Sequence, residues 1–475
     1  MIPDKLKKKI DELDAGQKSL LAKKAQDWLL GLSTINEIPM KDKKDGVLLT
    51  EAQKRLYKQC ETEDGYRANL VSQRVVLTGE INSEKFIKSL QLVLERHAAT
   101  KIFFRENDGI VYQCLDNSSE IDVAYNDFSL TKDDLVKFEY DFFNVRLDFQ
   151  SSNLFRCSLV KVEENTHHFY FLTHNLVFDA WSFSVMMTEL KQYYNASVGK
   201  SSELPERPIN DYLDYVVWQN EWKMSRRYQD ELEAWKKIIA PHSDDIKLDR
   251  ERNSSYGNKG HRIAFDLPVE LKSKLSAIGQ QQGATLFMTL LATINVFFAK
   301  TMGMKDICIG TINANRTRPE VESMIGYFLN LTPIYASVDI KNDKFSDIVG
   351  RIKNSVMHSV QNSDVYYEDL VASETRSFDK NRNPFYDVLF SYENLRDEDV
   401  LFSGITEQYE DIDKETARYD LTFSIYDEED RFHGWLEYNT SLYNRETVEV
   451  MFKEFIQVVD MLAKHPNQTM DKLES

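Results

Sequence analysis

The chain has 475 residues, a length typical of roughly two to three domain-sized units, and its 42% hydrophobic and 12% aromatic content suffices for sizeable packed cores. A net charge of −18, from 59 basic and 77 acidic residues, argues against nucleic acid or an anionic membrane surface as the main partner. No stretch approaches the roughly 18 to 20 apolar residues of a membrane span, and no apolar signal-peptide segment follows the lysine-rich start. These features predict a cytoplasmic protein.

The first 46 residues are predicted to form a helical extension and a linker. Apolar residues recur at three-to-four-residue spacing over residues 3–32, the pattern of an amphipathic helix. Gly31 and the polar run from Met40 to Gly46 end it. Such a helix either packs on the body of the protein or docks a partner protein.

From residue 47 onward the pattern mixes strands and helices. In the first half, the predicted strands cover residues 71–77, 155–162 and 168–172, and the predicted helices cover residues 83–96, with Ser83 as N-cap, and about 180–194. A stretch rich in proline and charge, residues 203–208, then interrupts the pattern.

The second half repeats this composition. Helices are predicted over residues 268–281, 285–300, 345–361 and 445–464, and strands over residues 307–312, 386–392, 421–426 and 434–439. We therefore predict an α/β fold with two similar lobes, residues 47–222 and 223–475. Substrates commonly bind in a cleft between lobes.

The four cysteines are scattered along the chain. None belongs to a CxxC pair, and none lies near histidines at zinc-binding spacing. They are Cys60, Cys114, Cys157 and Cys308. We expect all four to be reduced and structural, and we expect no metal.

One segment, Phe171 to Ser182, carries candidate chemistry. It reads as a strand that runs into a loop and then a helix, with His174 at the strand end and Asp179 five residues later. An imidazole there can lie in a cleft, while the carboxylate pairs with a cation to hold the loop. This arrangement suits acyl transfer, although a lone histidine is also commonly structural.

This segment resembles the HHxxxDG motif, usually followed by Trp-Ser, of the condensation domains of non-ribosomal peptide synthetases. The matching residues are His174, Asn175, Asp179, Ala180, Trp181 and Ser182. Other segments resemble further motifs of the family, in the family's order and over nearly the whole chain. These segments are Leu49–Tyr57, Glu95–Phe104, Asn210–Gln219, Gly283–Phe287, Ile309–Glu320, Ile325–Asn330, Arg382–Phe385, Tyr419–Thr422 and Leu436–Tyr438.

The resemblance implies two chloramphenicol-acetyltransferase-like lobes in a V-shaped pseudo-dimer with a central substrate tunnel. Donor and acceptor would arrive on the phosphopantetheine arms of acyl or peptidyl carrier proteins, and the chain, a monomer, would bind no cofactor itself. A segment at residues 360–370 and a loop in the later strands would roof or floor the tunnel. Trp181, Ser182, Tyr327 and Asn330 would line it. The end of the chain fits either a free-standing enzyme or a domain excised from a larger synthetase.

Asn175 occupies the position of the family's second histidine, which acts on the attacking amine. An amide has no useful basicity near neutral pH, so Asn175 cannot be a general base, but its carbonyl oxygen can accept a hydrogen bond from an amine and position it. Because a strand alternates its faces, we expect Asn175 to face the tunnel and His174 to point away. A rearranged loop would instead let His174 act. His167 and His168 lie mid-strand and are predicted to be structural.

The resemblance also implies a salt bridge between the motif aspartate, Asp179, and an arginine. Arg316 is the first choice and Arg318 the second. Ala180 replaces the motif glycine, whose N–H lies near the substrate carbonyl in the family and can help to hold an oxyanion. Alanine keeps this N–H but tolerates positive φ poorly, so it is expected to narrow the tunnel or tilt the loop.

Three functions remain open from the sequence. The first is an active condensation enzyme that joins a thioester donor to an amine or hydroxyl acceptor positioned by Asn175. The second is a catalytically silent platform that binds carrier proteins or a tailoring enzyme. The third is a related reaction, such as dehydration, epimerisation or acyl transfer to a soluble acceptor. Epimerisation is disfavoured because it would need a base in the tunnel.

Overall fold

The computed structural model describes residues 38–40, 43, 45–118, 121–129, 132–201, 204–206, 208–240, 257–374, 382–394, 400–428 and 432–472. The chain divides into two compact units, Met1–Lys41 and Asp42–Ser475. The helix predicted over residues 3–32 lies outside the described residues, as does part of the predicted linker. All described helices and strands belong to the second unit.

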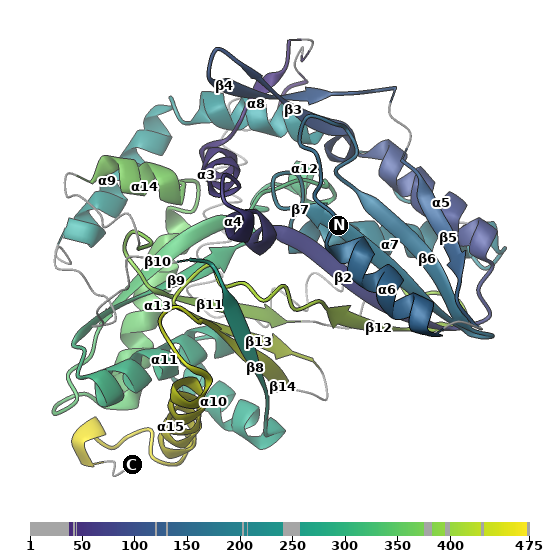
Figure 1. The fold of residues 1–475 in the computed structure, drawn as a ribbon. Helices are drawn as coiled ribbons and strands as arrows, with labels where there is room; N and C mark the ends of the chain where they lie inside the picture. Colours follow the sequence, from purple (N-terminus) through teal and green to yellow (C-terminus); the bar gives the residue numbers. More distant parts are fainter. Residues whose placement is uncertain are drawn as a thin grey trace, which may run out of the picture. The chain divides into compact units, whose positions relative to one another are not determined.

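A five-stranded sheet, in the order β12-β2-β7-β6-β5, carries the motif strand (Figure 1). The strands and their covering helices are β2 (Leu70–Gly79), β5 (Val123–Asp127), β6 (Arg156–Glu163), β7 (Thr166–His174), β12 (Ile405–Asp411), α5 (Ser83–Arg96), α6 (Lys132–Phe143) and α7 (Ala180–Ser197). Successive side chains in a strand point to opposite faces of the sheet, so Tyr170 and Phe171 of β7 pack against helices on opposite faces. Phe142 of α6 packs on Tyr170, whereas Phe183 of α7 packs on Phe171. The sheet is therefore buried on both faces.

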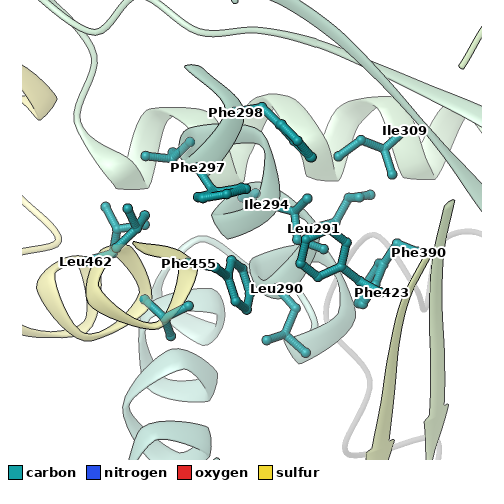
Figure 2. Close-up of a cluster of buried hydrophobic side chains, with 14 of the residues drawn as sticks. Leu290, Leu291, Ile294, Phe297, Phe298, Ile309, Phe390, Phe423, Phe455 and Leu462 are labelled. Atoms are coloured by element: carbon teal, nitrogen blue, oxygen red, sulfur yellow. The ribbon is translucent and has the colours of Figure 1, made fainter. Parts of the chain in front are cut away.

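A six-stranded sheet, in the order β10-β9-β11-β13-β14-β8, forms the second layer system. Its strands and packed helices are β8 (Gly260–Leu267), β9 (Asp306–Asn313), β10 (Asn330–Ser337), β11 (Val388–Asn394), β13 (Leu421–Asp427), β14 (Phe432–Asn439), α10 (Val269–Gln281), α11 (Leu286–Met302), α13 (Phe345–Gln361) and α15 (Arg445–Lys464). Figure 2 shows the core: Phe455 of α15 contacts Phe297 of α11 and Phe423 of β13, with ring centroids 5.7 and 5.1 Å away. Burial of each such ring contributes about 1.5–3 kcal/mol.

Among the described helices, no single one is long and apolar enough to cross a membrane. Helices α10 and α11 meet the length and composition criteria only as a pair, which is bent by 99°. The apolar side chains of α11 lie in the core just described.

Shorter elements complete the second unit. They are the strands of a small sheet, β1 (Val47–Leu48), β3 (Ile102–Asn107) and β4 (Ile110–Leu115), and the helices α3 (Glu51–Gln59), α4 (Glu63–Ala68), η2 (Ala98–Lys101), α8 (Tyr212–Trp222), α9 (Arg226–Ile239), α12 (Pro319–Glu322), α14 (Tyr367–Ser373) and η4 (Met470–Lys472). Helix α14, in the predicted crossing segment, contacts α3 from the first half of the chain and α9.

One strand crosses the lobe boundary that the sequence predicts at residue 222. Strand β12 comes from the second half but pairs antiparallel with β2, with Tyr409 opposite Val75 (Figure 1). Lys191 of α7, whose side chain is fully buried, forms an ion pair with Glu407 of β12 at 2.6 Å. Burial lowers the pKa of Lys191, and Glu407 opposes this shift. The two sheets are therefore not built from separate halves of the chain, because β12 of the second half belongs to the sheet of the first half. The lobe boundary at residue 222 stays a prediction.

Most predicted elements agree with the structure to within two or three residues at each end. The N-cap of α5 is an exception: it is Asn82 rather than Ser83, since the Asn82 side chain accepts a hydrogen bond from the Lys85 N–H at 3.0 Å. Strand β11 begins two residues later than predicted because Phe385 has φ of +70° and the Tyr386 N–H bonds the Pro384 carbonyl. All four cysteines are free and buried, as predicted.

Candidate active site

The motif loop joins the end of β7 to the start of α7, as the sequence predicts. Its backbone is anchored by two residues of the first lobe. The Asn175 N–H donates to the Asn69 carbonyl at 2.9 Å, and the Leu176 carbonyl accepts from Gln53 Nε2 at 2.8 Å. Gln53 is fully buried and lies within the Leu49–Tyr57 motif, where sequence reasoning gave it no role. Its presence in that motif was the only available signal.

The ion pair that the resemblance implies for Asp179 is present. Arg316 Nη2 lies 3.0 Å from Asp179 Oδ1, and the two side chains are 2% and 0% exposed. The second carboxylate oxygen accepts the backbone N–H of Phe328 at 3.0 Å. Asp179 is also the N-cap of α7, because Oδ1 accepts the Ser182 N–H at 2.8 Å. One buried carboxylate thus ties the motif loop, the helix it precedes and the second lobe together.

Both terminal nitrogens of Arg316 have partners, whereas its buried Nε has none among the described residues. Its Nη1 lies 2.5 Å from the carbonyl oxygens of both Val321 and Met324, and its guanidinium carbon lies 3.9 Å from the centroid of the Phe328 ring. Arg318, the second-choice partner, instead stacks over Trp218 at 4.2 Å. The structure therefore selects the first of the two arginines.

Ser182 belongs to this buried network. Its Oγ lies 2.7 Å from Asp179 Oδ1 and 2.8 Å from the Gly326 carbonyl, and accepts the Gly326 N–H at 3.0 Å and Arg316 Nη2 at 2.9 Å. Ser182 is fully buried. Its hydroxyl therefore fixes the distance between the start of α7 and the segment at Gly326.

The side chain of Asn330 forms hydrogen bonds with the crossing segment. Its amide nitrogen donates to the Val365 carbonyl at 2.8 Å, and its carbonyl oxygen accepts the Tyr367 N–H at 3.1 Å. This side chain therefore holds the crossing segment before α14. The tunnel-lining roles of Ser182, Asn330, the exposed Trp181 and the buried Tyr327 stay predictions.

His174 is locked inside the first lobe. Its ring stacks on Tyr66 with 5.4 Å between centroids and meets the edge of Phe149. Nδ1 accepts the Leu176 N–H at 3.1 Å, so the neutral ring carries its proton on Nε2, which lies 3.4 Å from Cys60 Sγ. Burial is the main reason that the pKa of His174 falls to about 3. Both nitrogens are occupied, which argues against His174 as a replacement base.

The buried neutral imidazole makes stability depend on pH. The folded pKa of about 3 lies below the ordinary value of 6.5, so the unfolded chain binds this proton more readily. The contribution of His174 is complete above pH 6.5 and is lost as pH falls toward 3, by about 1.4 kcal/mol per pH unit. The free energy of unfolding, obtained from thermal unfolding at each pH, should fall by about 2 kcal/mol between pH 6.5 and pH 5.

His174→Asn tests this contribution, because its side-chain oxygen can still accept the Leu176 N–H but does not titrate. This variant should have a shallower dependence of unfolding free energy on pH, whereas the exposed His261→Asn should keep the wild-type slope. Equal slopes for all three proteins would contradict the assignment.

Asn175, directly after His174, is 6% exposed. Its backbone N–H is engaged, but no described residue forms a hydrogen bond with its side-chain amide. Both ring nitrogens of His174, in contrast, have partners.

Ala180 is the first residue of α7 and is exposed. It is not among the described residues with positive φ, so its backbone does not adopt the conformation that alanine tolerates poorly. The expected narrowing of the tunnel or tilt of the loop stays a prediction. The helix begins here with right-handed geometry, which alanine favours. The first N–H groups of a helix have no intrahelical acceptor, so Ala180 keeps a donor that a ligand can use. His167 and His168 lie within β7, as predicted.

Comparisons with known proteins identify the family. Residues 43–475 match the condensation-domain family model. The chain therefore belongs to the condensation-domain family. It is 28% identical over 445 residues to surfactin synthase subunit 1 of Bacillus subtilis (strain 168), which covers 93% of this chain and 12% of that relative. It is 27% identical over 447 residues to bacitracin synthase 3 of Bacillus licheniformis, covering 93% of this chain and 7% of the relative. The chain thus spans a small part of these synthases.

Solved structures confirm the predicted α/β fold with two chloramphenicol-acetyltransferase-like lobes. The X-domain from teicoplanin biosynthesis superposes with a TM-score of 0.79 at 20% identity, covering 92% of this chain and all of that chain. The condensation domain of the monacolin K polyketide synthase MokA gives a TM-score of 0.78 at 16% identity, covering 90% and 98%. At these identities the likeness concerns the fold.

Proposed function

We propose that this chain is a condensation-type acyltransferase. It joins an acyl or aminoacyl donor, held as a thioester on the phosphopantetheine arm of a carrier protein, to an amine or hydroxyl acceptor. Donor and acceptor carrier proteins are its partners, and it works as a cytoplasmic monomer without a cofactor of its own. The observation that carries the proposal is the intact network around Asp179 beside an uncommitted Asn175 amide.

The hydrogen-bond network around Asp179 and Arg316 supports catalysis because it fixes the geometry of the motif loop. A buried ion pair of this kind destabilises the fold unless both charged groups have further hydrogen-bond partners. Here Asp179 accepts backbone and side-chain donors, and Arg316 reaches two carbonyls in addition to the carboxylate. Such a pair holds the loop between Asn175 and Ala180 in one geometry. In an enzyme without a general base, positioning of the reactants is the main source of rate acceleration.

Asn175 positions the nucleophile in this mechanism. Its Oδ1 accepts a hydrogen bond from the acceptor amine, whose lone pair attacks the thioester carbonyl carbon. The new N–C bond forms first and gives a tetrahedral oxyanion; its collapse breaks the C–S bond, and the amine proton ends on the departing thiolate. Asn175 does not take the proton, so the acceptor must arrive as the neutral amine. The Ala180 N–H at the start of α7 donates to the oxyanion of the intermediate.

A second function is a catalytically silent platform. The X-domain that this chain resembles in fold has been solved in a complex with OxyB from teicoplanin biosynthesis. The loss of the second motif histidine favours this alternative, whereas the preserved Asp179 network favours the enzyme. A platform needs the fold and a docking face but has no use for an uncommitted amide in the motif loop.

An assay with loaded carrier proteins distinguishes the two. Donor carrier, acceptor carrier and this protein are mixed, and intact-protein mass spectrometry follows transfer of the donor mass to the acceptor carrier. Condensation predicts an acceptor carrier heavier by the donor group, formed only when this protein is present. The absence of product with every donor and acceptor pair tried would favour the platform.

A further inference from the structure

A groove in the first lobe lies apart from the Asp179 network. It has a volume of about 430 Å³ and runs between α6, the first residues of β5 and β6, and the segment 145–153. Phe138, Phe142 and Phe155 supply apolar lining, and Arg156 and Ser158 supply polar lining. This volume and mixture of surfaces are typical of small-molecule sites.

Arg156, at the start of β6, brings an uncompensated cation into the groove. Its guanidinium carbon lies 5.0 Å from the centroid of the Phe142 ring. Within the described part of the chain, no residue forms a hydrogen bond or an ion pair with this guanidinium. A guanidinium has five N–H donors, and partial burial without acceptors is costly.

The other charged residues of the groove do not supply the missing partner. Arg146 is itself paired, with Glu63, and stacks over the ring of Tyr66 at 4.4 Å. Burial lowers the pKa of Arg156, the direction expected for a cation that has no ion-pair partner among the described residues. The groove therefore places the Arg156 guanidinium beside apolar rings; Asp122 and Asp148 also line it but form no hydrogen bond or ion pair with Arg156 among the described residues.

We propose that this groove binds a small amphiphilic anion, with a carboxylate or phosphate head on Arg156 and an apolar chain along Phe138, Phe142 and Phe155. The guanidinium fork matches both kinds of head with two parallel hydrogen bonds. The site shares a wall with the motif loop, because Phe155 packs edge-on against Phe178 with 5.7 Å between centroids. The inference does not depend on the condensation reaction.

Isothermal titration calorimetry of the full chain tests the site with octanoate and octyl phosphate as probes. Octan-1-ol and inorganic phosphate serve as chain-only and head-only controls. We expect one amphiphile per chain, with both controls at least tenfold weaker, and the tighter of the two amphiphiles identifies the head. If neither amphiphile binds at millimolar concentration, the site is refuted.

Two variants separate binding from folding. Arg156→Met keeps the length of the side chain and removes the charge, so it should weaken binding at least tenfold without lowering the melting temperature. Ala124→Phe fills the groove from an exposed position of β5 and should weaken binding with the charge intact. Arg226→Met, at a side chain 94% exposed on α9, is the matched control and should bind as the wild type does. Wild-type affinity in both groove variants would overturn the proposal.

Discussion

Replacing Asp179 by asparagine is expected to lower the unfolding free energy by about 3–5 kcal/mol. The substitution keeps the size of the side chain but leaves Arg316, which is 2% exposed, as a buried cation without its counterion. It also replaces one acceptor oxygen by a donor, so either the Phe328 N–H or the group of donors at Oδ1 loses its partner. Denaturant unfolding followed by circular dichroism measures the loss.

An exposed ion pair provides the control. On α15, Arg445 Nε lies 2.8 Å from Glu449 Oε1, and the two side chains are 67% and 42% exposed. Glu449→Gln should therefore lower the unfolding free energy by less than about 1 kcal/mol. The double variant Asp179→Asn with Arg316→Gln should be less destabilised than the sum of the single variants, because no unpaired charge remains. Purely additive effects would contradict a direct pair.

Replacing Asn175 by alanine is expected to lower kcat/KM for condensation by about 10- to 100-fold with little change in stability. The Asn175 side-chain amide has no hydrogen bond to a described residue, so its removal should change the stability of the fold little. The acceptor amine, in contrast, should lose the group that aligns it for attack. The loaded-carrier assay, run as single-turnover kinetics, measures the effect. Asn117→Ala, in the exposed turn after β4, should behave as the wild type.

The companion variant is Asn175→His, which restores a titratable group. A general base contributes about 10²- to 10⁴-fold, so the variant should be faster than the wild type and its rate should rise through the pKa of an imidazole. The wild-type rate should lack this dependence. Activity that appears only in Asn175→His would support the platform instead, and an unchanged rate in Asn175→Ala would remove Asn175 from the mechanism.

The parts of the site that could be predicted are those that recur as residue patterns. The run from His174 to Ser182 has its chemistry in consecutive positions, and the strand, loop and helix around it follow from local periodicity. Arg316 could be predicted as the partner of Asp179 only from the family resemblance. The two residues lie 137 positions apart, and no local sequence pattern links them. The roles of Gln53 and Asn69 were missed because both act through backbone groups of a distant loop.

The sequence by itself determined the α/β layering, the order of the motifs and the loss of a basic side chain at Asn175. These depend on side-chain periodicity and on residue identity, which are local properties. The tertiary structure alone decided that His174 is sealed by Tyr66 and Cys60, that Ser182 braces Gly326, and that β12 completes the other lobe's sheet. Those features depend on long-range packing, which sets burial and hydrogen-bond partners and is not encoded within a short window of sequence.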